Sequence, residues 1–236
     1  MSQRAIDARI AVYPVREDSR LLARFARPRA GDRVLEVGCG RGVASLVAAR
    51  RGARFVVATD LNPAALRTLY ERTRAEHLPV TPVRTDLAAG LKRFDLILSN
   101  PPYLPTKRRQ RDPDPWENLA LDGGPDGCHV TQRLLSTIPD HLSPGGRAYL
   151  VVSSLQSPRR LRALLETWRR RGGLCRTVAQ ERWGEERLKV WRLSRASRRT
   201  GRSTRGTGVR RPAPPRARSE SSRDAAPGRT TARDAA

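Results

Sequence analysis

The chain has 236 residues with 38% hydrophobic content, which suits one α/β domain with a core of ordinary size and leaves no room for a second large domain. It has no run of about 18 apolar residues, no signal-peptide core and no CxxC pair among its three cysteines, so we expect a soluble cytoplasmic protein without membrane spans, a disulfide framework or a metal site. The formal net charge of +24 favours phosphate-bearing partners such as RNA or the ribosome, although a coding bias toward arginine explains it equally well.

Strands and helices alternate along the sequence. Short apolar runs that end at turn residues predict strands, and apolar residues spaced three and four apart predict helices. The predicted strands are residues 33–37, 55–59, 80–85, 94–98, 147–152, 177–183 and 188–193. The predicted helices are residues 19–27, 43–51, 63–76, 130–141 and 158–171, with a turn at residues 143–146 and a hairpin turn at Gly184. This order predicts a parallel sheet that ends in an antiparallel hairpin.

The first strand ends in an acid and is followed by three alternate glycines. Glu36 precedes Gly38, Gly40 and Gly42, and an apolar helical pattern begins directly afterwards. This arrangement lets backbone N–H groups approach a nucleotide-like ligand, although alone it is also typical of a tight strand-to-helix connection. The chain has neither the dinucleotide GxGxxG spacing nor a P-loop, so the site does not require a phosphate group.

A polar residue also follows each of the next three strands. Asp60 and Asp86 follow the second and third strands, and Asn100 follows the fourth. Because the carboxyl ends of parallel strands meet at one edge of a sheet, we expect Glu36 and these three residues to line one crevice. Helix capping or loop solvation explains any one of them, but hardly all four. A ligand with a ribose, an adenine and a zwitterionic amino acid fits this set, with the ribose hydroxyls on Asp60.

Asn100 opens the tetrad Asn100-Pro101-Pro102-Tyr103, the most informative stretch of the chain. The Asn carboxamide accepts and donates hydrogen bonds, and the prolines fix φ and remove two N–H donors. We expect a planar NH₂ group to donate one hydrogen to the Asn100 oxygen and one to the Pro101 carbonyl, with Tyr103 packed on its face. Its lone pair would then point at an electrophile. A rigid turn without chemical meaning is the alternative for the tetrad alone.

Together, these motifs resemble those of class I S-adenosylmethionine-dependent methyltransferases, and among them the HemK-type protein glutamine methyltransferases of the short archaeal and eukaryotic branch. The resemblance runs from residue 12 to residue 193. It is carried by YPVREDS at residues 13–19 with Leu21 and Leu22, the glycine turn at 36–42, NPPY at 100–103 and LDGGPDG at 121–127. It implies a Rossmann-like class I methyltransferase fold with a mostly parallel seven-stranded sheet, and S-adenosyl-L-methionine as cofactor.

The resemblance also implies a role for each site residue. The residues implied to bind the cofactor are Ser19, Glu36 and Gly38 at its methionine end, Gly40 in the same turn, Asp60 at the ribose, Asp86 and the backbone of Leu87 at the adenine, and Asn100. The residues implied to bind the substrate are Asn100, Pro101, Pro102 and Tyr103, of which Asn100, Pro101 and Tyr103 are catalytic. Ser19 is also placed to cap the helix predicted at residues 19–27. Residues 122–127 are either an active-site lid or a glycine-rich turn.

No strong base accompanies the tetrad, so we expect catalysis by positioning of a weakly nucleophilic nitrogen. The resemblance points to the glutamine of the Gly-Gly-Gln motif in a class I release factor, and to a small activator subunit as partner. The alternative is a nucleic-acid methyltransferase that acts on an exocyclic amine of adenine or guanine in RNA or DNA. It would hold that amine with the same clamp, formed by Asn100, Pro101 and Tyr103, but we find no target-recognition domain in this sequence. A non-catalytic RNA-binding protein with a relict cofactor pocket is the third alternative.

Two basic segments complete the chain. The loop at residues 106–118 carries Lys107, Arg108, Arg109 and Arg111, and either contacts a macromolecular substrate or is an ordinary surface loop. Residues 194–236 hold twelve arginines and three acids with Val209 as the one large aliphatic residue, so we expect a disordered tail of net charge +9. The domain at residues 1–193 keeps a net charge of +15.

Overall fold

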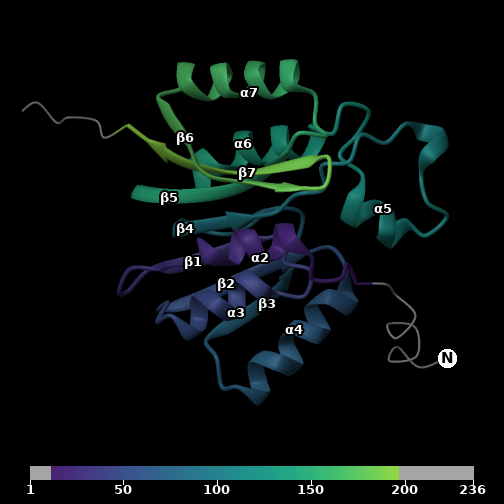
Figure 1. Ribbon diagram of the computed structural model, residues 1–236. Coiled ribbons are helices and arrows are strands. Elements are labelled where there is room, and N and C mark those ends of the chain that lie inside the picture. Colours follow the sequence, from purple (N-terminus) through teal and green to yellow (C-terminus); the bar gives the residue numbers. More distant parts are fainter. Residues whose placement is uncertain (1–11, 197–236) are drawn as a thin grey trace, which may run out of the picture. The chain divides into compact units, whose positions relative to one another are not determined.

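The computed structural model describes residues 12–196, built around one seven-stranded sheet (Figure 1). The strands are β1 Arg33–Val37, β2 Phe55–Asp60, β3 Val80–Arg84, β4 Phe94–Ser99, β5 Leu142–Ser153, β6 Gly173–Trp183 and β7 Glu186–Arg195. Their order across the sheet is β3-β2-β1-β4-β5-β7-β6. Strands β1 to β5 pair in parallel, and β7 is antiparallel to both β5 and β6. The predicted parallel sheet with a C-terminal antiparallel hairpin is confirmed.

Helices cover both faces of this sheet. They are α2 Glu17–Arg24, α3 Val43–Arg50, α4 Pro63–Ala75, α5 Pro115–Leu121, α6 His129–His141 and α7 Pro158–Arg170, with a short 3-10 helix at Arg108–Gln110. Helices α2, α3 and α4 bury their apolar side chains with Val34 of β1, whereas α6 and α7 pack on the side of the neighbouring Leu35. Successive strand residues thus face opposite layers, which is why the strands read as continuous apolar runs.

The first described helix begins earlier than its sequence pattern indicates. Helix α2 starts at Glu17 with Arg16 in the N-cap position, so Ser19 lies within the first turn and the predicted capping role of Ser19 is wrong. Glu17 and Asp18 occupy the first turn, where negative side chains are favoured by the helix dipole. The helix ends at Arg24, three residues before the predicted end.

The predicted turn at residues 143–146 lies inside β5. The register of β5 against β4 shifts between the pairs Phe94–Leu142 and Leu96–Arg147, so the extra residues are absorbed within the strand. Gly145 has a φ of +74°, which explains why the sequence reads as a turn.

Helix α5 was not predicted, although a local signal for it exists. Asp114 accepts a hydrogen bond from the Trp116 N–H at 2.9 Å, and Pro115 occupies the first turn, a common arrangement at helix starts.

The C-terminal boundary differs slightly from the prediction. Strand β7 continues to Arg195, two residues past the predicted domain end at residue 193. The predicted disordered tail otherwise lies outside the described residues. Within residues 12–196, no helix is both long enough and apolar enough to cross a membrane.

Candidate functional site

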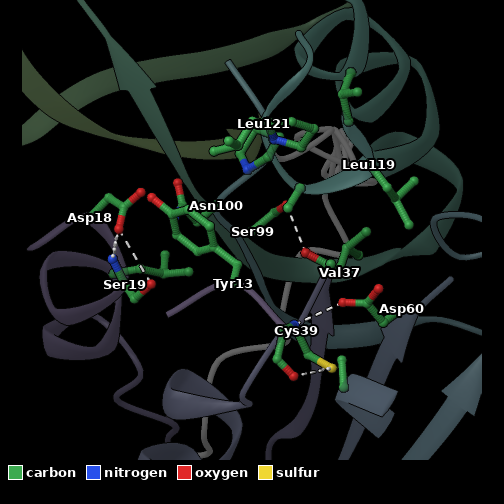
Figure 2. Close-up of a pocket in the computed structure, with 18 of the residues that line it drawn as sticks. Tyr13, Asp18, Ser19, Val37, Cys39, Asp60, Ser99, Asn100, Leu119 and Leu121 are labelled. Atoms are coloured by element: carbon green, nitrogen blue, oxygen red, sulfur yellow. Dashed lines mark hydrogen bonds between the residues drawn. The ribbon is translucent and has the colours of Figure 1, made fainter. Parts of the chain in front are cut away.

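A pocket of about 370 Å³ lies at the carboxyl ends of the parallel strands (Figure 2). Strand β1 runs between β2 and β4, and Val37 is in register with Thr59 and Ser99, so the residues that follow these strands meet. The strand order reverses here, which is where open α/β sheets bind ligands. All eleven predicted site residues line this pocket: Ser19, Glu36, Gly38, Gly40, Asp60, Asp86, Leu87, Asn100, Pro101, Pro102 and Tyr103.

The three glycines after β1 share a left-handed backbone but differ in their surroundings. Gly38, Gly40 and Gly42 all have positive φ, at +67°, +49° and +68°. A Cβ added to Gly42 would collide with the side chain of Leu69 in the core, whereas a Cβ on Gly38 or Gly40 would have no atom of the described residues within 4 Å, apart from its own chain neighbours. The turn therefore packs against the core at Gly42 and leaves room for a ligand over the two pocket-lining glycines.

Two acids hold this turn and the helix that follows it. Glu36 is 4% exposed, and its Oε2 accepts hydrogen bonds from the Ser45 N–H at 2.7 Å and from the Ser45 hydroxyl. Asp60 accepts one from the Gly40 N–H at 2.8 Å. Burial raises the pKa of Glu36 to about 7 and also raises the pKa of Asp60. A cationic group bound beside these acids would favour their charged forms.

A strained residue forms part of the pocket wall after β3. Leu87 has a φ of +52°, a left-handed conformation that costs a non-glycine residue free energy and is common at functional sites. The buried Thr59 hydroxyl donates to the Leu87 carbonyl at 2.7 Å and holds this conformation. The preceding Asp86 is exposed and accepts a hydrogen bond from Arg133 at 2.5 Å.

Asn100 carries an unsatisfied hydrogen-bond acceptor. Its Oδ1 is buried and accepts no hydrogen bond from any residue between 12 and 196. A buried acceptor without a partner costs a folded protein about 1–3 kcal/mol. Because Asn100 lines the pocket with Pro101 and Tyr103, this oxygen fits a ligand that brings its own N–H donor.

Asp18, a residue that the sequence patterns did not single out, connects Ser19 on the cofactor side of the pocket with Tyr103 of the tetrad. Asp18 is 4% exposed, and its Oδ1 accepts hydrogen bonds from the Ser19 N–H at 2.6 Å and the Ser19 hydroxyl at 3.3 Å (Figure 2, dashed lines). The Tyr103 hydroxyl donates to Asp18 Oδ2 at 3.2 Å. An acid in the first turn of a helix is usually exposed, so its position in the sequence gave no sign of this contact.

Two tyrosines share this acidic surrounding. Burial and the Asp18 carboxylate raise the pKa of Tyr13 to about 12, and the same two causes hold the pKa of Tyr103 far above its ordinary value. The negative charge of Glu186 in β7 also raises the pKa of both tyrosines, although Glu186 is distant from them in the sequence. Both phenols therefore stay protonated at neutral pH, and Tyr103 is fixed as a hydrogen-bond donor.

The loop at residues 106–118 divides into two parts. Its basic residues Lys107, Arg109 and Arg111 are exposed, and Arg111 pairs with Asp122 at 2.9 Å. Trp116 at the start of α5 instead lines the pocket. The loop thus contributes an apolar side chain to the pocket and basic side chains to the surface.

Comparison with known proteins gives relatives over most of this region. The family described as methyltransferase small domain matches residues 14–114. A putative protein N5-glutamine methyltransferase of Methanocaldococcus jannaschii is 36% identical over 145 residues, which cover 61% of this chain and 73% of that protein. The human methyltransferase HEMK2 is 33% identical over 198 residues, which cover 78% of this chain and 90% of that protein.

A bacterial relative is matched over a smaller share. A release factor glutamine methyltransferase of Deinococcus radiodurans is 39% identical over 146 residues, which cover 58% of this chain and 50% of that protein. Among solved structures, the E. cuniculi Mtq2–Trm112 complex, described as responsible for the methylation of the eRF1 translation termination factor, gives a TM-score of 0.60 at 24% identity. That match covers 78% of this chain and 99% of that chain, so the two share a fold.

The raised pKa of Glu36 makes a prediction about stability. The folded chain keeps a proton on Glu36 up to about pH 7 that the unfolded chain releases near pH 4.5, so this residue lowers stability as the pH rises through that window. We expect Glu36→Gln, which keeps an acceptor for Ser45, to stabilise the chain without ligand at pH 8 by up to about 3 kcal/mol, and much less at pH 5. Denaturant unfolding at both pH values measures this, and a pH-independent difference would contradict the assignment.

Proposed function

The chain belongs to the HemK-type family of N5-glutamine methyltransferases, and we propose that it methylates the side-chain amide of a glutamine in a class I translation release factor. Its fold is the predicted Rossmann-like fold of class I methyltransferases. The predicted resemblance to the short branch is also confirmed, since an archaeal and a human relative are matched over most of their length. The names of the bacterial relative and of the E. cuniculi complex support a release factor as the substrate. The family resemblance implies the glutamine of its Gly-Gly-Gln motif as the acceptor.

One observation carries the proposal, namely the buried Oδ1 of Asn100 in the wall of an acidic pocket, which has no hydrogen-bond partner within residues 12–196. An amide NH₂ group supplies the donor that this oxygen lacks. A carboxamide nitrogen is a poor nucleophile because its lone pair is delocalised into the carbonyl, so it reacts only when held in place. A site that offers a fixed acceptor rather than a strong base suits such a group.

The residues of the pocket fit S-adenosylmethionine, the cofactor that the class I methyltransferase family implies. Bound there, it supplies an electrophilic methyl group on a sulfonium centre. The open space over Gly38 and Gly40 admits a ligand against the backbone, and the buried acid Glu36 favours the positive charge of its methionine end. We assign the residues to its parts as follows: Ser19, Glu36, Gly38 and Gly40 to the methionine end, Asp60 to the ribose, Asp86 and Leu87 to the adenine, and Asn100 to the reacting end.

The acceptor is held by the tetrad after β4. Asn100 Oδ1 accepts one amide hydrogen, the Pro101 carbonyl accepts the other, and Pro102 keeps the segment extended. Tyr103 presents its face to the nitrogen, and its hydroxyl bond to Asp18 fixes the ring. Such placement contributes roughly 7–11 kcal/mol in favourable cases. The Asn100 oxygen, the Pro101 carbonyl and the face of Tyr103 stabilise the positive charge that develops on the nitrogen.

The partners follow from the substrate. A release factor is a cytoplasmic protein that works on the ribosome, where a basic surface such as the exposed Lys107, Arg109 and Arg111 is attracted to RNA. The E. cuniculi complex contains Trm112, and we propose that the present chain also binds a small activator subunit of this kind.

The substrate is tested by incubating the protein with methyl-labelled S-adenosylmethionine and, separately, a class I release factor, total RNA and DNA. We expect label in the release factor only, and none in a release factor whose Gly-Gly-Gln glutamine is replaced by alanine. A small activator subunit is added in a parallel series. Label confined to nucleic acid would replace this proposal with a base methyltransferase, and absence of cofactor binding would favour the relict pocket.

Asn100→Ala tests the clamp. We expect turnover to fall at least about 100-fold, as when a fixed hydrogen-bonding group is removed from an active site. Cofactor affinity should change less than about tenfold, or 1.4 kcal/mol. Because the Asn100 oxygen has no partner in the part of the chain that the structure describes, the variant without ligand should unfold at the wild-type temperature or higher. Single-turnover methylation, calorimetric cofactor binding and thermal unfolding measure these effects, and an unimpaired rate would remove Asn100 from the mechanism.

The glycine turn offers a matched pair of variants. Gly38→Ala and Gly42→Ala meet nearly the same backbone strain, about 1–3 kcal/mol, because both residues have similar positive φ. Gly38→Ala adds a methyl group to the open pocket and should weaken cofactor binding at least about tenfold. Gly42→Ala adds one against Leu69, so it should be the less stable variant and keep the affinity of its folded fraction. Equal affinities in calorimetric titrations would show that no ligand lies over Gly38.

A further inference from the structure

The segment at residues 121–127 is tied to the stretch that follows the acceptor tetrad. Leu104 donates its N–H to the Leu121 carbonyl at 3.0 Å and accepts a hydrogen bond from the Gly123 N–H at 2.9 Å. This pairing is a short parallel bridge outside the main sheet. The segment therefore lies directly beside Tyr103.

Gly127, at the end of this segment, lies in close contact with the backbone of Tyr103 in the tetrad. Its φ is +71°, and a Cβ added there would collide with the carbonyl oxygen of Tyr103. Only glycine allows both this conformation and this close approach of two backbones. The position of Gly127 thus limits where the Tyr103 backbone can lie.

Gln156, between β5 and α7, fixes Gly127 from the side of the sheet. Its Nε2 donates to the Gly127 carbonyl at 2.8 Å and to Thr131 Oγ1 at 2.9 Å. Its Oε1 accepts a hydrogen bond from the Ser153 N–H at 2.9 Å. The side chain is 1% exposed, so these bonds form in a low-dielectric interior, where they are strong and expensive to lose.

We propose that Gln156 is a positioning residue of the acceptor clamp, an inference that rests on the proposed function. It acts through the Gly127 carbonyl and the Gly127 contact with Tyr103, while Asp18 holds the hydroxyl end of the same tyrosine. Both ends of Tyr103 are thereby fixed by buried polar groups. The sequence did not decide whether residues 122–127 form a lid or a turn. In the structure they act as a brace, that is, a segment fixed by Leu104 and Gln156 that limits the position of Tyr103.

Two nearly isosteric variants separate positioning from general stability. Gln156→Met removes the bond to Gly127 together with the bonds to Thr131 and Ser153, whereas Thr131→Val removes one bond of the same amide and leaves Gly127 held. We expect Gln156→Met to lower kcat about 10–100-fold with cofactor affinity unchanged, since a small misplacement far from the chemistry has effects of that size. Thr131→Val should keep the wild-type kcat.

The proposal fails if Gln156→Met keeps the wild-type kcat, or if both variants lose kcat equally. Hydrogen exchange of the variants without ligand tests it independently of activity: the Leu104 and Gly123 amides should exchange faster in Gln156→Met than in Thr131→Val. Equal exchange in the two variants overturns the proposal. If the wild-type protein does not methylate a release factor, the proposed function fails while this exchange comparison still decides the brace. Should Gln156→Met not fold, Gln156→Glu, which keeps an acceptor for Ser153, replaces it in both measurements.

Discussion

The register between neighbouring parallel strands brings together the functional groups at the ends of these strands. Strand β1 pairs with β2 on one side and β4 on the other, and the three strands end at the same level. Residues that follow them are therefore brought together, although about 60 positions separate Glu36 from Asn100. A shift of one residue in any of these pairings would turn the side chains to the opposite face and dismantle the pocket.

The pocket is assembled from groups that disfavour the folded state without a ligand. Glu36 is buried with a raised pKa, Leu87 has a left-handed backbone, and Asn100 holds an oxygen without a hydrogen-bond partner among the described residues. Each lowers the stability of the empty site, and a ligand that supplies a cation and N–H donors relieves these costs. Binding and stability are thus coupled, because a ligand that favours the folded state raises the free energy of unfolding.

Local patterns predicted the seven strands and the residues at their ends, because a strand end and its register follow from a few consecutive residues. The contacts of Asp18 and Gln156 were beyond such patterns, since their partners Tyr103 and Gly127 lie 85 and 29 positions away. The arginine-rich composition likewise gave no indication that one arginine is buried. Arg147 is one of 44 arginines but is 5% exposed, paired with Asp32 at 2.9 Å, and nothing in its neighbourhood marks it as a core residue.

The antiparallel strand β7 has a consequence for the order in which the protein becomes competent. Glu186 and Leu188 line the pocket, and the Ser153 hydroxyl at the end of β5 bonds to Glu186 at 2.5 Å. While the chain emerges from the ribosome, the parallel strands are available long before this hairpin. The pocket wall is therefore completed only when β7 inserts between β5 and β6, after the strands that carry Glu36, Asp60 and Ser99 have been made.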